Sequence, residues 1–182
     1  MSISVARAVP LIADHPNLLV VQTMSKSRAL AGLRVGYALG DAGLIEALRR
    51  AKDSFNSYPL GRLAQVGATA SVRDEAYFRE SCGRVVAGRE AMTRALIGLG
   101  FAVLPSSANF VFATHPARGG AEFAAALRDR AVLVRHFNQP RTASYLRITV
   151  GTEDNTRRLI AAAADILGMS SGDREKTAQH ID

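Results

Sequence analysis

Cysteine and tryptophan are nearly missing from this sequence. Cys82 is the single cysteine of the 182 residues, and there is no tryptophan. An intramolecular disulfide is therefore excluded, and a reducing compartment, the cytoplasm, is expected. Stability must come from an ordinary apolar core, for which 48% hydrophobic residues in a chain of this length are sufficient.

Long hydrophobic runs are missing as well. No apolar stretch approaches the roughly 18 residues of a membrane-spanning helix. The N-terminal segment MSISVARAVPLIADHP lacks the apolar region of a secretory signal. We therefore expect neither a membrane span nor a signal peptide.

Negative charge is scarce, because 16 acidic residues face 23 basic ones and the formal net charge is +7. Such an excess could serve a nucleic-acid partner. The basic residues are scattered at helical spacing, however, without a run of five and without interleaved aromatics. We expect no nucleic-acid partner. We also expect no metal site, because the four histidines are dispersed along the chain: His15, His115, His136 and His180.

Two apolar runs near the N-terminus, NLLVVQ (17–22) and RVGYALG (34–40), are typical of buried strands of the parallel type. A helix is expected to begin behind Asp41, a good N-cap residue, and to extend to residue 55. Two such strands without further strands to cover them indicate part of a larger sheet.

The rest of the chain alternates helical and strand-like patterns. A long helical pattern covers 73–100, and helices are also expected over 63–72, 121–130 and 154–168. Strands are expected within FAVLP, ANFVFAT, AVLVRHF and SYLRITV, between residues 101 and 150. The pattern predicts an α/β chain with three parts: 1–75, then 76–168 led by a long bridging helix, and a flexible tail over 169–182.

The segment TMSKSRALAGLRVGY (23–37) places an amine directly after a strand. Lys26, if partly desolvated beside other positive charge, would be a nucleophile for an aldehyde. Thr23, Ser25 and Arg34 offer hydroxyls and a guanidinium for a phosphate. An aldehyde and a phosphate are the two anchoring groups of pyridoxal 5'-phosphate. The alternative is a solvated lysine and an arginine paired with a carboxylate.

This segment resembles the cofactor-lysine motif of the fold-type I, pyridoxal-phosphate-dependent class I/II aminotransferases, and most closely that of the histidinol-phosphate aminotransferase family. Three further segments are similar to landmarks of the C-terminal half of that family: PSSANFVF (105–112), VLVRHF (132–137) and YLRITVGTEDN (145–155). The resemblance implies an α/β fold made of the C-terminal part of the large, cofactor-binding domain, within 1–75, and the complete small α+β domain.

The resemblance also assigns roles to single residues. Lys26 would be the Schiff-base lysine that also shuttles the proton of the substrate carbon. Ser25 and Arg34 would hold the cofactor phosphate, with Thr23 as a weaker candidate. The alternative is still a solvated lysine in a polar loop and an arginine that pairs with a nearby carboxylate.

The candidate substrate-binding residues lie in the second half of the chain. By resemblance, Arg147 and Arg135 would grip the acidic groups of the substrate, and Asn109 would lie near the same pocket. Each has a structural alternative: a surface ion pair for the arginines, and satisfaction of strand-edge backbone groups for the asparagine.

The reaction implied is amino transfer between histidinol phosphate and 2-oxoglutarate, giving imidazole acetol phosphate and glutamate. Family features expected before the lysine strand are absent, including the aspartate that pairs with the pyridine nitrogen. The chain is therefore expected to be incomplete for catalysis alone, and to form a homodimer or to pair with a separate N-terminal half. The alternatives are another class I/II aminotransferase, a threonine-phosphate decarboxylase-like enzyme, or a non-catalytic remnant acting as an interaction module.

Overall fold

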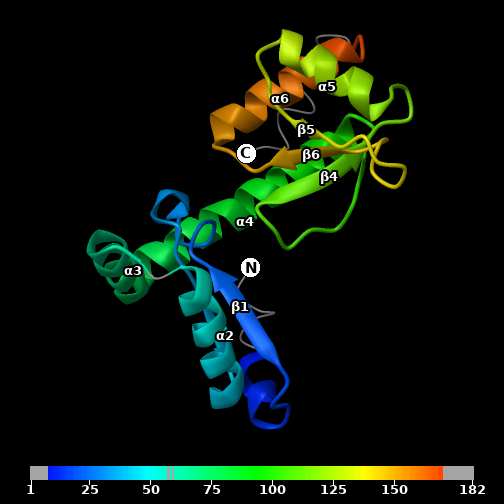
Figure 1. Ribbon diagram of the computed structural model, residues 1–182. Helices are drawn as coiled ribbons and strands as arrows, with labels where there is room; N and C mark the ends of the chain where they lie inside the picture. The colour runs from blue at the N-terminus through cyan, green and yellow to red at the C-terminus, as the bar shows by residue number, and fades with distance from the viewer. Residues whose placement is uncertain (1–7, 57, 59, 170–182) are drawn as a thin grey trace. The chain divides into compact units, whose positions relative to one another are not determined.

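The computed structural model describes residues 8–56, 58 and 60–169 (Figure 1). The chain divides into two compact units, Met1–Cys82 and Gly83–Asp182. We call them the N-terminal unit and the C-terminal unit. Each combines helices with a small sheet, which confirms the predicted α/β class. The assignment of these units to a cofactor-domain remnant and a small domain stays a prediction.

The N-terminal unit is built around two strands. After the 3₁₀ helix η1 (Val9–Ala13), strand β1 (Leu19–Thr23) pairs antiparallel with β2 (Gly36–Gly40). The connection between them contains the short 3₁₀ helix η2 (Ala31–Leu33).

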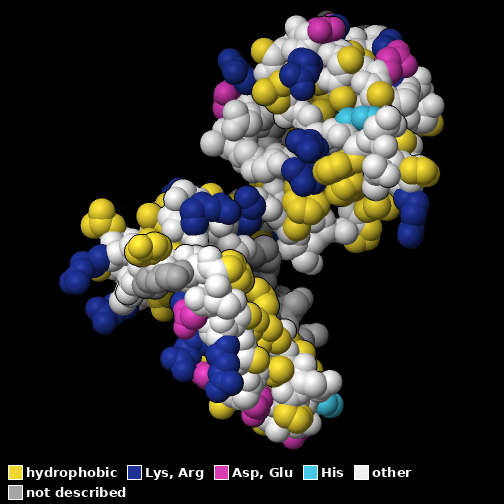
Figure 2. Space-filling view, in the orientation of Figure 1, with side chains coloured by type: hydrophobic (Ala, Val, Ile, Leu, Met, Phe, Trp, Pro, Cys, Tyr) yellow, Lys and Arg dark blue, Asp and Glu magenta, His cyan; other side chains and the backbone are white. Residues whose placement is uncertain are grey.

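The predicted parallel orientation of these strands is wrong, because they run antiparallel. They are also less buried than predicted: Val20 is buried, whereas Val21 is 66% exposed. A continuous apolar run indicates that both faces of a strand can be covered, but it contains no information about direction. Figure 2 shows a band of hydrophobic side chains along the visible face of this unit.

Helix α2 (Ala42–Phe55) begins behind Asp41, as predicted. The Asp41 side chain accepts a hydrogen bond from the Gly43 N–H at 2.8 Å, which satisfies a free donor of the first turn. Helix α3 (Arg62–Arg73) follows.

The long helical pattern is α4 (Glu75–Gly98), with 24 residues. The boundary between the two units falls inside this helix, between Cys82 and Gly83. None of the helices in the described ranges is long and apolar enough to cross a membrane.

The C-terminal unit contains a four-stranded antiparallel sheet of order β3-β4-β6-β5. Its strands are β3 (Ala102–Val103), β4 (Phe110–Thr114), β5 (Arg135–His136) and β6 (Leu146–Thr149). Its helices are α5 (Gly120–Asp129) and α6 (Glu153–Ile166). Thr152 and Asn155 form a capping box at the start of α6. Of the predicted tail, only Met169 lies within the described residues.

One face of this sheet is the core of the unit. Val111 and Ala113 of β4 and Leu146 and Ile148 of β6 are buried against residues of α4, α5 and α6. Because successive side chains of a strand alternate between faces, Phe110, Phe112 and Arg147 lie on the opposite face. The sheet thus separates a dry core from an accessible face.

Candidate functional site

Lys26 lies in a tight loop directly after β1, Met24–Leu30, which we call the lysine loop. The loop is closed by a hydrogen bond from the Leu30 N–H to the Met24 carbonyl at 3.1 Å, and the Ala29 N–H donates to the Lys26 carbonyl at 3.1 Å. Met24 is buried with Val35 and Ala68 of α3, and Leu30 packs against the same cluster. The loop is therefore attached to the body of the unit on its apolar side.

The Lys26 side chain is exposed. The partial desolvation expected from the sequence is not supplied by the described residues. An amine on a closed loop that is open to solvent can be reached by an incoming aldehyde.

Two hydroxyl side chains lie on the N-terminal side of Lys26. Thr23 Oγ1 donates to Ser25 Oγ at 2.9 Å, and the Ser25 N–H donates to Thr23 Oγ1 at 3.2 Å. These contacts hold the two hydroxyls together at the end of β1.

Arg34 lies at the start of the other strand. The Met24 N–H donates to the Val35 carbonyl at 3.1 Å, so the segments with Lys26 and Arg34 leave the same end of the two-stranded sheet. Arg34 is exposed and adopts a left-handed backbone conformation with φ of 55°. Within the described ranges, its guanidinium donates to the Ala31 carbonyl of its own turn at 3.2 Å.

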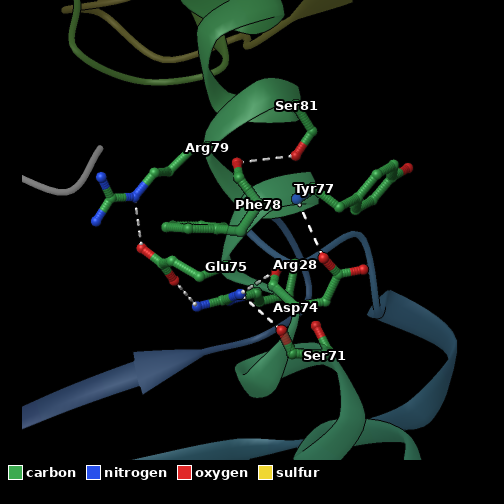
Figure 3. A network of polar contacts seen from close by, with 8 residues as sticks. All are labelled: Arg28, Ser71, Asp74, Glu75, Tyr77, Phe78, Arg79 and Ser81. Carbon is green, nitrogen blue, oxygen red and sulfur yellow. Dashed lines mark hydrogen bonds and ion pairs between the residues drawn. The ribbon is translucent and has the colours of Figure 1, made fainter.

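Arg28 is the residue of this region that sequence reasoning missed. Its guanidinium lies among residues at the junction of α3 and α4, which Figure 3 shows from close by. Nη1 donates to the Ser71 carbonyl at 2.7 Å, Nη2 pairs with Glu75 at 3.3 Å, and the guanidinium carbon lies 3.7 Å from the centre of the Phe78 ring. These partners are 43 or more residues away in the sequence, so no local pattern could have indicated them.

Glu75 is shared by two arginines. Arg79 donates to its other oxygen at 3.1 Å. The hydrogen bond from Arg79, and then that from Arg28, lower the pKa of Glu75, while desolvation opposes them. The carboxylate is thus held in its charged form.

The accessible face of the C-terminal sheet brings together the two arginines predicted to bind substrate. Arg135 lies directly opposite Arg147 in the β5–β6 register, and Phe112 lies opposite Arg147 on the other side. We call this surface the arginine–aromatic face; it consists of Phe110, Phe112, Arg135, Phe137 and Arg147.

The two guanidinium groups of this face share an aromatic ring. The guanidinium carbons of Arg135 and Arg147 each lie 5.4 Å from the centre of the Phe137 ring, and that of Arg147 lies 5.3 Å from Phe110. Among the described residues, neither arginine is paired with a carboxylate. Like charges opposite each other on neighbouring strands destabilise a sheet unless an anion lies between them.

Arg147 has a further unsatisfied group. Its Nε is buried and has no hydrogen-bond partner within the described part of the chain. A buried donor without a partner costs free energy, and such groups in native proteins call for an explanation. The unpaired positive charges of Arg135 and Arg147, rather than this covered Nε, give the arginine–aromatic face the properties of an anion site.

Two further residues considered from the sequence, Asn109 and His136, take part in hydrogen bonds within the C-terminal unit. The Asn109 carbonyl accepts a hydrogen bond from the Val150 N–H at 2.9 Å, which continues the β4–β6 ladder next to the face. His136 lies opposite Leu146, on the core side of β5, with Nε2 2.8 Å from the Ala143 carbonyl. No group of three His, Cys, Asp or Glu side chains suited to a metal occurs among the residues described.

Comparison with known proteins places these observations in a family. The sequence model of the family "Aminotransferase class I and II" matches residues 2–162. "Histidinol-phosphate aminotransferase 1" of Bradyrhizobium diazoefficiens is 61% identical over 160 residues, which are 88% of this chain and 46% of the relative. The chain therefore spans about half the length of the curated relatives it matches.

Solved structures agree with this placement. Histidinol-phosphate aminotransferase from Sinorhizobium meliloti, solved in complex with pyridoxal-5'-phosphate, matches with a TM-score of 0.72 and 27% identity, covering 85% of this chain and 42% of that one. A decarboxylase from Sulfurospirillum multivorans matches with a TM-score of 0.76 and 26% identity, covering 87% and 46%. The fold is thus part of a larger fold of this kind. With a family match over most of its length, the chain belongs to the class I and II aminotransferases.

Proposed function

We propose that this chain provides the cofactor lysine and the substrate-binding arginines of a pyridoxal 5'-phosphate-dependent aminotransferase. The reaction that fits best is amino transfer between histidinol phosphate and 2-oxoglutarate, giving imidazole acetol phosphate and glutamate. The identity of 61% with the Bradyrhizobium enzyme supports this substrate pair. The observation that carries the proposal is the closed lysine loop, which presents one amine beside hydroxyl and guanidinium donors.

The residues of the loop fit two groups of the cofactor. Lys26 can bond the aldehyde, while Thr23, Ser25 and Arg34 can donate to the phosphate. The hydroxyls now bond to each other at 2.9 Å and Arg34 to a backbone carbonyl at 3.2 Å, so each can exchange a neutral partner for an anion. Residues 23–37 include no carboxylate that would repel a phosphate.

Lys26 is also the group that moves the proton. When bound, pyridoxal phosphate supplies an electron sink for the substrate carbon that loses its proton. The basic side chains of residues 23–37 are Lys26, Arg28 and Arg34. Guanidinium groups stay protonated in proteins, so Nζ of Lys26 is the one that can take a proton and return it.

The arginine–aromatic face suits two substrates that carry different acidic groups, carboxylates in one and a phosphate in the other. One pocket must accept glutamate, with its carboxylates, and then a phosphate monoester. Planar guanidinium forks bind both anions in a bidentate way, and the paired forks of Arg135 and Arg147 would supply up to two such contacts. Asn109 lies directly before β4, and its proposed contact with the substrate rests on the family resemblance alone.

Part of the site would come from residues outside this sequence, because the chain spans 46% of the Bradyrhizobium relative. The ring nitrogen of pyridoxal phosphate needs a carboxylate partner, and residues 23–37, which surround the proposed cofactor lysine, supply none. The exposed apolar residues of the N-terminal unit, among them Val21 at 66% exposure, indicate a surface made to be covered. We propose that a homodimer partner or a separate N-terminal half covers it, and that the chain alone binds the cofactor weakly and has negligible activity.

Other chemistry in the same family remains a second candidate. The Sulfurospirillum decarboxylase has a similar fold at 26% identity, so a fold of this kind does not by itself specify amino transfer. A non-catalytic interaction module would keep the fold without using Lys26. The far higher identity to histidinol-phosphate aminotransferases favours amino transfer.

Reductive trapping tests the role of Lys26. The sequence contains three lysines, Lys26, Lys52 and Lys176, so borohydride reduction in the presence of pyridoxal phosphate can be mapped completely by mass spectrometry. We expect an adduct of low occupancy that favours Lys26 and disappears in Lys26→Ala, whereas Lys52→Ala leaves it unchanged. Equal labelling of the three lysines would contradict the proposal.

A further inference from the structure

We propose that Arg28 is a positioning residue that holds the lysine loop, and with it Lys26, against the junction of α3 and α4. This inference rests on the proposed function of Lys26. Arg28 itself would touch neither cofactor nor substrate. It would act through the loop in which both residues lie.

The Arg28 side chain is 15% exposed, whereas the carboxylate of Glu75, with which it pairs, is 49% exposed. Its Nη1 donates to the Ser71 carbonyl at 2.7 Å and, more weakly, to the Asp74 carbonyl at 3.4 Å. Its Nη2 donates to Glu75 Oε2 at 3.3 Å. Three acceptors on two helices thus meet one planar group (Figure 3).

These acceptors explain why the position suits an arginine. Ser71 lies in the last turn of α3, and Asp74 is its C-cap. The last carbonyls of a helix lack intrahelical donors and carry partial negative charge, so a cation there is favourable. The guanidinium carbon also lies over the Phe78 ring, 3.7 Å from its centre, a contact that an ammonium would make less well.

The loop has a conformation that needs such support. Ala29, the residue after Arg28, has a φ of 55°, in the left-handed region that residues with a Cβ seldom adopt. Strained backbone persists where its surroundings hold it. Met24 and Leu30 anchor the two ends of the loop through the apolar cluster, and Arg28 anchors the middle, two residues from Lys26.

Hydrogen exchange of the full chain tests the anchor without any cofactor. Arg28→Ala should speed exchange of the Ala29 and Leu30 amides by about ten- to hundredfold, the effect of losing charged hydrogen bonds. Arg28→Lys keeps the positive charge but lacks the planar guanidinium, so it should give a smaller increase in the exchange rate. This variant replaces Arg28→Ala in the test if the alanine variant does not fold. Arg79→Ala is the matched control, because Arg79 also bonds Glu75 and, among the described residues, has no hydrogen bond to the loop.

Trapping with pyridoxal phosphate then connects the anchor to Lys26. In Arg28→Ala the ratio of adduct at Lys26 to adduct at Lys52 should fall several-fold, and in Arg79→Ala it should match the parent. Unchanged loop exchange in both Arg28 variants, or an equal change in Arg79→Ala, would overturn the inference. A parent that does not favour Lys26 would instead contradict the proposed function, while the exchange data still decide whether Arg28 anchors the loop.

Discussion

The two units of the chain differ in how completely they bury their apolar residues. Among the described residues, the core of the C-terminal unit contains sixteen buried hydrophobic residues. The corresponding cluster of the N-terminal unit contains three, Met24, Val35 and Ala68. Hydrophobic burial is the main favourable contribution to folding, so the C-terminal unit holds most of the stability that this chain can supply.

The two units also differ in which part of the proposed site they contain. In the N-terminal unit, Leu63 is 85% exposed and Val66 is 61% exposed, both on α3, and Val21 of β1 is 66% exposed. The proposed cofactor lysine lies in this weakly covered unit, whereas the proposed substrate arginines lie on the well-packed sheet. We therefore expect the chain alone to retain anion binding, whereas cofactor binding should depend on what covers the N-terminal unit.

The largest expected effect is on the C-terminal core. Phe123 is 1% exposed and packs edge-on against Phe101, with ring centres 5.2 Å apart. Phe123→Ala should lower the free energy of unfolding by about 3–5 kcal/mol. Val21→Ala, at a position of the N-terminal unit that is 66% exposed, should change it by no more than about 0.5 kcal/mol. Urea unfolding followed by circular dichroism measures both, and equal costs would contradict the difference between the units.

A second test uses two adjacent glycines of the C-terminal unit. A Cβ on Gly120 would lie 2.7 Å from the Ala143 carbonyl oxygen, whereas one on Gly119 would meet nothing within 4 Å. Gly120→Ala should therefore destabilise the chain by about 1–3 kcal/mol through overpacking. Gly119→Ala should be nearly neutral. The same urea titration measures the pair, and a neutral Gly120→Ala would show that the loop at Ala143 can move away.

A smaller effect is expected at the arginine–aromatic face. Arg147→Leu removes an unpaired buried Nε and a like-charge pair, so it should stabilise the chain by about 0.5–1.5 kcal/mol while abolishing phosphate binding. Phosphate should raise the unfolding temperature of the parent and not that of the variant. Arg157→Leu is the control, because Arg157 pairs with Glu153 at 3.3 Å on the exposed side of α6. A parent insensitive to phosphate would contradict the anion site.

The smallest effect is a pH dependence in the N-terminal unit. Arg79, and then Arg28, lower the pKa of Glu75 from its ordinary value of 4.5. A carboxyl with a lowered folded-state pKa contributes stability above its unfolded-state pKa, and this is lost as the pH falls through the folded value. Acidification below 4.5 should therefore remove the stability difference between the parent and Glu75→Gln. Because Glu75 is 49% exposed, salt should reduce that difference at neutral pH.

Local patterns were enough to predict much of this molecule. Capping chemistry predicted the start of α2 behind Asp41. The period of the hydrophobic residues predicted the long helix α4 and the strands around Phe110 and Leu146. The string around Lys26 indicated the candidate site, because its residues are neighbours in sequence.

What escaped prediction depends on long-range pairing. The direction of β1 against β2 is not encoded in the apolarity of either strand. The positions of Arg135 and Arg147 opposite each other depend on the β5–β6 register. The sequence assigned no role to Arg28, because its partners Ser71 and Glu75 lie on helices far along the chain.

The central claim is that Lys26 performs the chemistry once the N-terminal unit is covered. Its most direct test is co-expression of this chain with the part of the Bradyrhizobium enzyme that it does not match, followed by amino transfer from glutamate in the presence of pyridoxal phosphate. We predict activity for the parent pair and none for the pair with Lys26→Ala. Equal turnover by the two pairs would contradict the account.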